Sequence, residues 1–348
     1  MKYTMFLMIA IVLLAACTAP TPAGPQVLRV MTHDSFSVSE EVIAAFEAEH
    51  NVTVQFLKAG DAGTMLNQAI LSKAAPQADI LYGVDNTFLS RALGADIFSP
   101  YRAEGLANVP ATLQLDSEYR VTPVDYGDVC LNYDKAYFEN SGLAIPQTLA
   151  DLARPEYKDL LVVENPASSS PGLAFLITTI ANFSEERYLD FWEDLHANKV
   201  LVVDGWDTAY TSEFSGGATS EGTRPMVVSY ATSPAAEVFF SEGALTEPPT
   251  GAITAPGMCF RQIEFAGILK GTPNEALAEA FIEFLLSDTF QNDIPLQMWV
   301  FPVSERAALP QVFHDFAATA QEPASVPAAA IEQHRERWIQ EWTEAVLR

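Results

Sequence analysis

The chain has 348 residues, of which 49% are apolar and 18% charged, so it has enough apolar side chains for a sizeable core and is not wholly disordered. Its 45 Asp and Glu residues outnumber its 19 Lys and Arg residues, which gives a formal charge of −26 at pH 7. Binding to nucleic acid needs a basic stripe that displaces counterions from phosphates, and this composition argues against one. A neutral or cationic small partner is compatible with the charge.

The N-terminus has the form of an export signal. Residues 1–16 contain one lysine, an apolar run too short to span a bilayer, and then small residues. The run ends in Leu-Ala-Ala-Cys, which is typical of lipoprotein signals in which the cysteine, here Cys17, is acylated; an ordinary cleavage site is the alternative. Residues 17–26 are rich in proline and predict an extended tether. We therefore expect an exported, membrane-anchored lipoprotein that faces the periplasm or the cell exterior.

The next segment alternates strands with short amphipathic helices. Strands are predicted at residues 26–32, 52–56 and 78–84, and helices after a capping box at 37–40 and over 62–72. This alternation indicates a mainly parallel α/β sheet. Ligands of such sheets bind at the carboxyl ends of the strands, which makes the loops 33–36, 60–64 and 85–87 candidate site loops.

A second set of elements follows before the chain returns to the first. It comprises a strand at 129–134, helices after 168–172 and over 185–198, and strands near Val200 and Met226. The apolar segment 258–269 resembles a return strand, and a patterned helix covers 274–286. We predict that residues 27–128 form the first part of lobe 1, that residues 129–258 form an inserted lobe 2, and that residues 259–348 comprise the return to lobe 1 and the C-terminal helices, with the lobe that the final helix covers left open. Crossing segments near 125–134 and 255–265 would join the lobes, with a ligand cleft between them.

Four further features of the sequence concern cysteines, metal motifs, one polar segment and the C-terminus. Cys130 and Cys259 could form one disulfide if the crossing strands are neighbours, and two buried free thiols are the alternative. The sequence contains no CxxC motif and no His/Cys cluster, so a metal site is not predicted. The Gly/Ser/Thr-rich segment 211–224 is interpreted as an exposed insertion, and a final helix over 329–347 is expected to pack its tryptophans into a core.

Several expected loops place aromatic residues beside acids and small polar residues. Asp34, Asp85, Tyr126, Trp206 and Tyr230 belong to such loops. An aromatic face attracts a cation by roughly 0.5–2 kcal/mol, and a nearby carboxylate supplies the counter-charge, so these loops suit a flat organic cation. The serines before Pro171 predict a helix start that either binds an anion or is a plain N-cap. No G-x-S-x-G, P-loop or H-E-x-x-H motif is present, so catalysis has no motif to support it.

Eight short motifs are spread over most of the mature chain, at 32–36, 78–86, 125–127, 169–175, 205–206, 229–234, 299–303 and 337–342. Their order and content resemble those of thiamine-binding proteins of bacterial ABC transporters, a branch of the type II periplasmic binding proteins. The resemblance implies a two-lobed α/β protein, most simply a monomer without a cofactor, that captures thiamine or a thiamine phosphate and delivers it to an ABC permease. Together with the loop candidates, the expected ligand-binding residues are Asp34, Asp61, Ala62, Asp85, Tyr126, Ser169, Ser170, Trp206, Tyr230, Ala231, Thr232, Ser233 and Trp299.

Two positions depart from the family pattern, and other functions stay open. His33 replaces a residue that is often aromatic in the family, and Ala62 stands where Gly is common. The same fold could bind a polyamine, which needs similar acid and aromatic groups, or ferric iron, although the adjacent tyrosines of iron sites are absent. An exported hydrolase using Ser169 is the third alternative.

Overall fold

The computed structural model describes residues 26–218 and 220–348. The predicted signal peptide, Cys17 and the tether up to residue 25 lie outside the described residues. Lobe 1 begins with β1 (Gln26–Thr32), α1 (Glu40–His50), β2 (Val52–Lys58), α2 (Ala62–Leu71) and β3 (Ile80–Asp85). Strand β1 pairs in parallel with both β2 and β3, which confirms the parallel α/β arrangement predicted from the alternating pattern.

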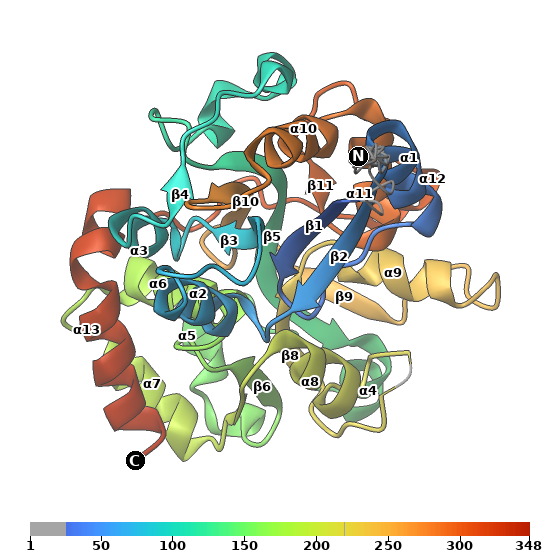
Figure 1. The fold of residues 1–348 in the computed structure, drawn as a ribbon. Coiled ribbons are helices and arrows are strands. Elements are labelled where there is room, and N and C mark those ends of the chain that lie inside the picture. The colour runs from blue at the N-terminus through green and yellow to red at the C-terminus, as the bar shows by residue number, and fades with distance from the viewer. Residues whose placement is uncertain (1–25, 219) are drawn as a thin grey trace, which may run out of the picture.

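One long strand carries the sheet from lobe 1 into lobe 2. The first part of β5 (Thr122–Asp134) pairs antiparallel with β10 (Phe260–Leu269), which in turn pairs with β3. The second part of β5 pairs with β8 (Met226–Tyr230) and β9 (Thr250–Ile253) of lobe 2. The described residues therefore form a single sheet of eleven strands (Figure 1). Its remaining strands are β4 (Phe98–Ser99), β6 (Leu161–Glu164), β7 (Leu201–Val203) and β11 (Phe301–Pro302).

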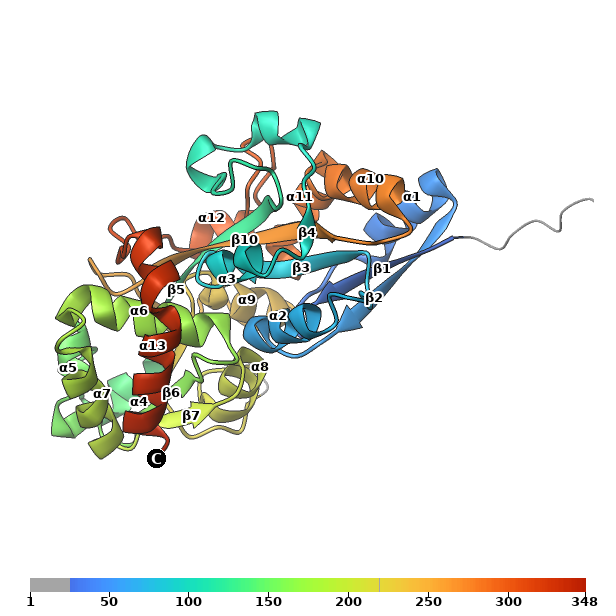
Figure 2. The ribbon, with the colours of Figure 1, turned by 60° about the vertical axis from the view of Figure 1, so that its left-hand side comes forward.

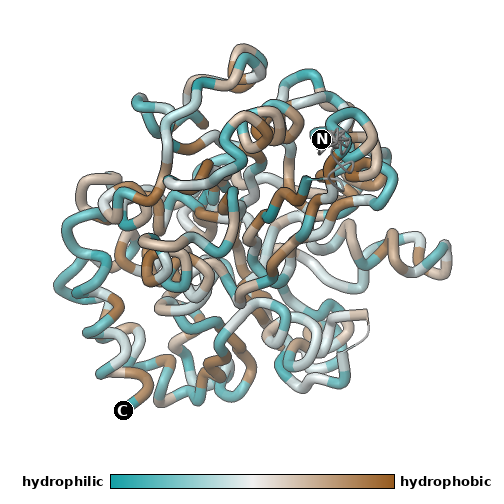
Figure 3. The backbone as a smooth tube through the Cα atoms, in the orientation of Figure 1, coloured by the Kyte–Doolittle hydropathy of each residue, from teal (hydrophilic) through white to brown (hydrophobic). Residues whose placement is uncertain are grey.

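Helices cover the sheet in both lobes. Lobe 1 adds α3 (Leu89–Gly94), α10 (Glu275–Leu285), α11 (Asp288–Gln297) and α12 (Gln311–Phe316). Lobe 2 contains α4 (Lys135–Ser141), α5 (Leu149–Leu152), α6 (Ser170–Phe183), α7 (Tyr188–Ala197), the short α8 (Trp206–Thr208) and α9 (Ser233–Phe240). In Figure 3 the central strands are largely hydrophobic and the outer helices alternate in hydropathy, as expected for one apolar face packed on the sheet.

Three stretches of chain meet where β5 and β10 pass between the lobes. The Arg261 guanidinium donates two hydrogen bonds of 2.8 Å to the buried Asp128 carboxylate. Cys130 and Cys259 form a disulfide beside this ion pair. These are the two crossing segments that the sequence predicts. Residues 317–324 form a third stretch of chain here, in which the Ala320 amide donates a hydrogen bond to Asp128 at 2.7 Å.

The last helix, α13 (Ala328–Val346), packs on both lobes. Arg335, in its first half, donates to the Ser90 hydroxyl at 3.2 Å and lies over the Phe88 ring of lobe 1. Trp342, in its second half, packs edge-on against Trp192 of α7, with ring centroids 5.4 Å apart. Figure 2 shows α13 running beside α7 toward α3. The sequence does not specify which lobe the final helix covers, and in the structure the second half of α13 packs on α7 of lobe 2.

The start of α1 also differs from the prediction. Its N-cap is Ser39, whose side chain makes no capping hydrogen bond, so a capping box from Ser37 does not form. The Ser39 hydroxyl donates to Asp293 at 2.5 Å, and the Ser37 hydroxyl donates to Gln297 at 3.0 Å. Both hydroxyls therefore donate to side chains of α11, a helix distant in the sequence, and neither caps the start of α1.

The Cys130–Cys259 disulfide should stabilise the fold, since it closes a loop of 129 residues in the unfolded chain. We expect reduction by dithiothreitol to lower the free energy of unfolding by about 2–5 kcal/mol, measured by urea unfolding. A Cys130→Ala/Cys259→Ala variant is the control and should not respond to the reductant. An identical urea midpoint for the reduced and oxidised protein would contradict the prediction.

Candidate ligand-binding cleft

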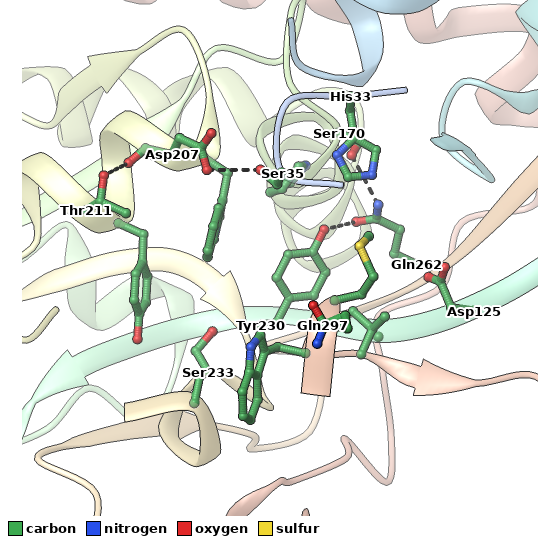
Figure 4. Close-up of a pocket in the computed structure, with 18 of the residues that line it drawn as sticks. His33, Ser35, Asp125, Ser170, Asp207, Thr211, Tyr230, Ser233, Gln262 and Gln297 are labelled. Atoms are coloured by element: carbon green, nitrogen blue, oxygen red, sulfur yellow. Dashed lines mark hydrogen bonds between the residues drawn. The ribbon is translucent and has the colours of Figure 1, made fainter. Parts of the chain in front are cut away.

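A cavity of about 380 Å³ lies between the two lobes and is lined by residues of both (Figure 4). Its volume falls within the range of small-molecule sites. The lining residues are His33, Ser35, Asp61, Asp125, Gly127, Ser170, Pro171, Trp206, Asp207, Tyr210, Thr211, Gly217, Ala218, Tyr230, Ser233, Ala236, Glu237, Phe240, Gln262, Glu264, Gln297, Met298, Trp299 and Val300.

On the lobe 1 side, Asp61 is the N-cap of α2 and also contacts lobe 2. Its carboxylate accepts hydrogen bonds from the amides of Ala62 at 2.7 Å and of Trp206 at 3.1 Å. Shielding from water raises the pKa of Asp61, although both amide hydrogen bonds lower it. A second link between the lobes runs from the Ser35 hydroxyl to Asp207, 3.0 Å away (Figure 4).

The base of the cavity is formed by β5 and β10 and carries a group of ionisable side chains. The imidazole of His33, which follows β1, lies 3.3 Å from the Glu264 carboxylate. Burial alone would lower the pKa of His33, but Glu264, with smaller contributions from Asp61 and Asp125, raises it to about 9. The buried Asp125 carboxylate accepts a hydrogen bond from Tyr82, and burial together with Glu264 holds the pKa of Asp125 well above its usual range.

Lobe 2 contributes an aromatic wall. The rings of Trp206 and Tyr210 stack with centroids 5.1 Å apart and an angle of 16° between them. The Trp206 indole is oriented by donating to the Ser229 hydroxyl at 2.9 Å. Tyr230 lies edge-on to Trp206 and donates to Gln262 at 3.2 Å. The wall thus presents aromatic faces to the cavity, each oriented by a neighbouring group.

Aromatic residues also surround one side of the opening. The ring centroid of Trp299, a lobe 1 residue, lies 5.3 Å from the ring centroids of both Phe239 and Phe240 at the end of α9. The backbone of Trp299 has a φ of 56°. The backbone carbonyl of Trp299 accepts a hydrogen bond from the buried Thr232 hydroxyl of lobe 2. Phe240 is 61% exposed, although it also lines the cavity. These contacts join the two lobes at the edge of the cavity.

The structure gathers some of the sequence-predicted site residues around the cavity and leaves others away from it. Those that line it are Asp61, Ser170, Trp206, Tyr230, Ser233 and Trp299. Those that do not are Asp34, Ala62, Asp85, Tyr126, Ser169, Ala231 and Thr232.

Tyr126 is outside the cavity because successive residues of a strand face opposite sides of a sheet. Asp125 and Gly127 line the cavity, whereas Tyr126 stacks on Phe301 on the other face, with ring centroids 5.5 Å apart. Asp85 does not line the cavity either, because its fully buried carboxylate accepts a hydrogen bond from the Thr87 hydroxyl at 2.8 Å. Burial raises the pKa of Asp85 to about 7.

The other five displaced residues have structural roles beside the site. Asp34 accepts from the Gly60 amide at 3.0 Å and thereby holds the loop before Asp61. Ala62, Ser169, Ala231 and Thr232 are at most 2% exposed and pack behind the lining.

Residues on β5 and β10 were the main omission from the predicted site. Asp125, Gln262 and Glu264 line the cavity but were not chosen from the sequence. The alternation of side chains along a strand could have identified them, because Asp125 and Tyr126 must face opposite sides of the sheet, as must Glu264 and its neighbours. The segment 211–224 also differs from the predicted exposed insertion, because Thr211, Gly217 and Ala218 line the cavity.

Two lobes that share one sheet and enclose a cavity lined from both sides define a solute-binding protein. Comparison with known proteins agrees with this class. Residues 75–322 match the bacterial extracellular solute-binding protein family. The chain is 31% identical to the thiamine-binding periplasmic proteins of Salmonella typhimurium and of Escherichia coli, with 97% of this chain and 98% of each relative aligned. A solved structure of a periplasmic thiamin-binding protein superposes with a TM-score of 0.82 at 27% identity, covering 93% of this chain and 97% of that one.

The chain therefore belongs to the bacterial extracellular solute-binding proteins. Its two-lobed α/β fold agrees with the expectation from the sequence. Among the described helices, none combines the length and the apolar character needed to cross a bilayer. Within residues 26–218 and 220–348, no group of three or more His, Cys, Asp and Glu side chains is arranged to hold a metal ion.

The pKa of His33 can be measured by NMR titration of its imidazole. We expect a value of about 9 in the ligand-free protein, and a value near or below 6.5 in Glu264→Gln, because burial then dominates. A raised folded-state pKa means that His33 contributes stability fully below pH 6.5 and loses it as the pH rises through about 9. Glu275→Gln, on the exposed start of α10, is the control and should leave the titration of His33 unchanged. Titration of wild-type His33 near 6.5 would contradict the prediction.

Proposed function

We propose that this protein captures thiamine between its lobes for uptake by an ABC transporter. The observation that carries the proposal is the cavity itself, which combines stacked aromatic rings with carboxylates at the junction of the lobes. The thiamine-binding names of relatives that align over nearly the whole chain support the same ligand.

Thiamine combines two flat rings, one of which is a permanent cation. The rings of Trp206 and Tyr230 offer faces on which such a cation is attracted by the ring quadrupole. Asp61 from lobe 1 and Asp207 from lobe 2 supply acidic groups toward the cation, and Gln262 and Ser233 supply polar groups for the aminopyrimidine. The cavity volume of about 380 Å³ suits a molecule of this size.

Binding would favour the closed form, because the ligand touches both lobes only when they are together. In this arrangement Asp61 already bridges the lobes through the Trp206 amide, so the ligand adds to contacts that close the cleft. The closed, loaded protein would then deliver thiamine to a membrane permease. The export signal and Cys17 complete the proposal of a lipid-anchored, monomeric protein outside the cytoplasm that works without a cofactor.

We propose binding without catalysis. Ser169, the residue considered as a hydrolytic nucleophile, is fully buried and does not line the cavity. A nucleophile must reach its substrate and a base, and this position offers no access.

A polyamine is the second candidate, because the acidic and aromatic lining suits any organic cation. Ferric iron has less support, since the described part of the chain lacks a metal-ligating group of three His, Cys, Asp or Glu side chains. The stacked Trp206 and Tyr210 favour a flat ligand over a flexible aliphatic one.

Titration with thiamine, followed by Trp fluorescence, should give a saturable change with submicromolar affinity. Spermidine at the same concentrations should not displace thiamine, because it cannot stack on the rings. Mass spectrometry of the small molecules released from denatured protein gives an independent answer. No response to thiamine, or displacement of bound thiamine by spermidine, would refute the proposed ligand.

Trp206→Ala should weaken thiamine binding by about 1–3 kcal/mol, because it removes a stacking face, while the fold stays intact. Isothermal titration calorimetry measures the affinity, and circular dichroism checks the fold. Tyr126→Leu is the matched control: it also removes an aromatic ring beside the cleft, but Tyr126 faces away from the cavity. Equal losses in the two variants would place the ligand elsewhere.

A further inference from the structure

The start of α2, a lobe 1 helix, is capped in part by lobe 2. We propose that the amides of Gly63 and Thr64 and the Ser168 carbonyl of lobe 2 form a clasp that secures the closed cleft from outside the cavity. The inference goes beyond the proposed function, because it concerns the closing of the lobes and not the identity of the ligand. Only its affinity measurement rests on thiamine as the ligand.

The first turn of an α-helix has N–H groups that find no acceptor within the helix. In α2 the amides of Ala62, Gly63 and Thr64 are in this position. The Ala62 amide donates to the side chain of its N-cap, Asp61, at 2.7 Å. The other two donate to one acceptor in the opposite lobe, the Ser168 carbonyl, at 2.9 Å from Gly63 and 3.3 Å from Thr64. Lobe 2 therefore completes the cap of a lobe 1 helix.

Lobe 2 presents the Ser168 carbonyl on a loop that its own hydrogen bonds hold in place. The Asn165 carbonyl accepts from the Ser168 amide at 3.2 Å. The Ser168 hydroxyl donates to the Asp204 carbonyl at 2.7 Å, which ties this loop to the one that leads into α8. The second loop returns a hydrogen bond to lobe 1, from the Trp206 amide to Asp61. In Figure 2, α2 lies next to α8 at the junction of the lobes, so hydrogen bonds cross this junction in both directions.

Gly63 permits the close approach of the two lobes. A Cβ atom at this position would lie 2.8 Å from the carbonyl oxygens of both Ala167 and Ser168, and 2.9 Å from the Phe88 ring of lobe 1. Backbone oxygens cannot turn aside as a flexible side chain can, so a side chain at residue 63 pushes the lobes apart. Neither Gly63 nor Ser168 lines the cavity. The clasp can therefore be altered without touching the bound ligand.

The clasp acts on the equilibrium between open and closed lobes. Its hydrogen bonds form only while the lobes are together, so they stabilise the closed form whatever the ligand is. A larger closed fraction raises the apparent affinity for a ligand that binds the closed form. Because the clasp forms after the ligand has entered, its loss should speed release and leave the rate of association unchanged.

The binding test compares Gly63→Ala with the matched control Gly94→Ala. Both replace a helical glycine by a better helix former, but a Cβ at residue 94 has nothing within 4 Å. We expect Gly63→Ala to weaken thiamine binding on the order of tenfold, as the loss of such hydrogen bonds would, and Gly94→Ala to leave it unchanged. Ser168→Ala, which unties the two loops of lobe 2, should weaken binding by a smaller factor. Calorimetry measures the affinity, and stopped-flow fluorescence measures the release rate.

Hydrogen exchange tests the clasp without a ligand. Amides in the first turn of a helix exchange freely unless they find a partner outside the helix. We expect the amides of residues 63 and 64 to be protected in the wild-type protein and to lose that protection in Gly63→Ala, as followed by NMR. The rest of α2 should keep its protection, because the change acts on the contact between the lobes.

The outcomes separate the clasp from the proposed function. Unchanged affinity and unchanged protection in Gly63→Ala overturn the clasp and leave the proposed function standing. Loss of protection along the whole of α2 assigns the effect to packing against Phe88 and also overturns the clasp. Absence of thiamine binding by the wild-type protein refutes the proposed function, and the exchange of residues 63 and 64 in the ligand-free protein then decides on the clasp alone.

Discussion

The antiparallel pair of β5 and β10 is the constraint on which the rest of the molecule depends. Strand β5 is thirteen residues long and belongs to both lobes, so the lobes share one sheet. The Arg261–Asp128 ion pair and the Cys130–Cys259 disulfide hold this pair where it passes between the lobes. Since Asp125 and Glu264 come from the same two strands, the element that joins the lobes also forms the base of the cavity.

The buried carboxylates of this protein fall into two groups with different surroundings. Asp79 and Asp128 are well satisfied: Asp79 accepts from the Arg29 amide at 2.7 Å, and Asp128 is paired with Arg261. Glu164 and Glu237, in contrast, retain buried oxygens without donors. Burying such groups costs stability, and costs of this kind concentrate at functional sites. Glu237 lines the cavity, and Glu164 precedes the helix that begins with the lining residue Ser170, so these incompletely satisfied acids lie at the cleft or next to it.

Periodicity and motifs predicted most of the architecture, and contacts between distant segments explain what they missed. The elements of the first parallel sheet, the inserted lobe and the two crossing segments are encoded by local patterns and by the order of motifs. Six of the predicted site residues reach the cavity: five lie at a strand end or a helix start, and Trp299 lies in the connection between α11 and β11. Tyr126 was predicted to line the site but does not, because a motif does not identify which residues of a strand face the cavity. The alternation of side chains along β5 selects Asp125 instead. The role of α13 could not be read from its sequence, since an amphipathic pattern does not identify the lobe that it covers.

The overall charge of −26 has little bearing on recognition by itself. Charges on the solvated surface are screened within about 8 Å at physiological ionic strength, so most of the 45 acids act only on the encounter with the ligand. Charges that are buried or partly buried at the cleft are screened less than those on the open surface. Of all these acids, only those that α2, α8, α9, β5 and β10 direct into the cavity can act directly on a bound ligand. The carboxylates that face the cavity, together with the His33 imidazole beside Glu264, therefore set the charge that a bound ligand meets.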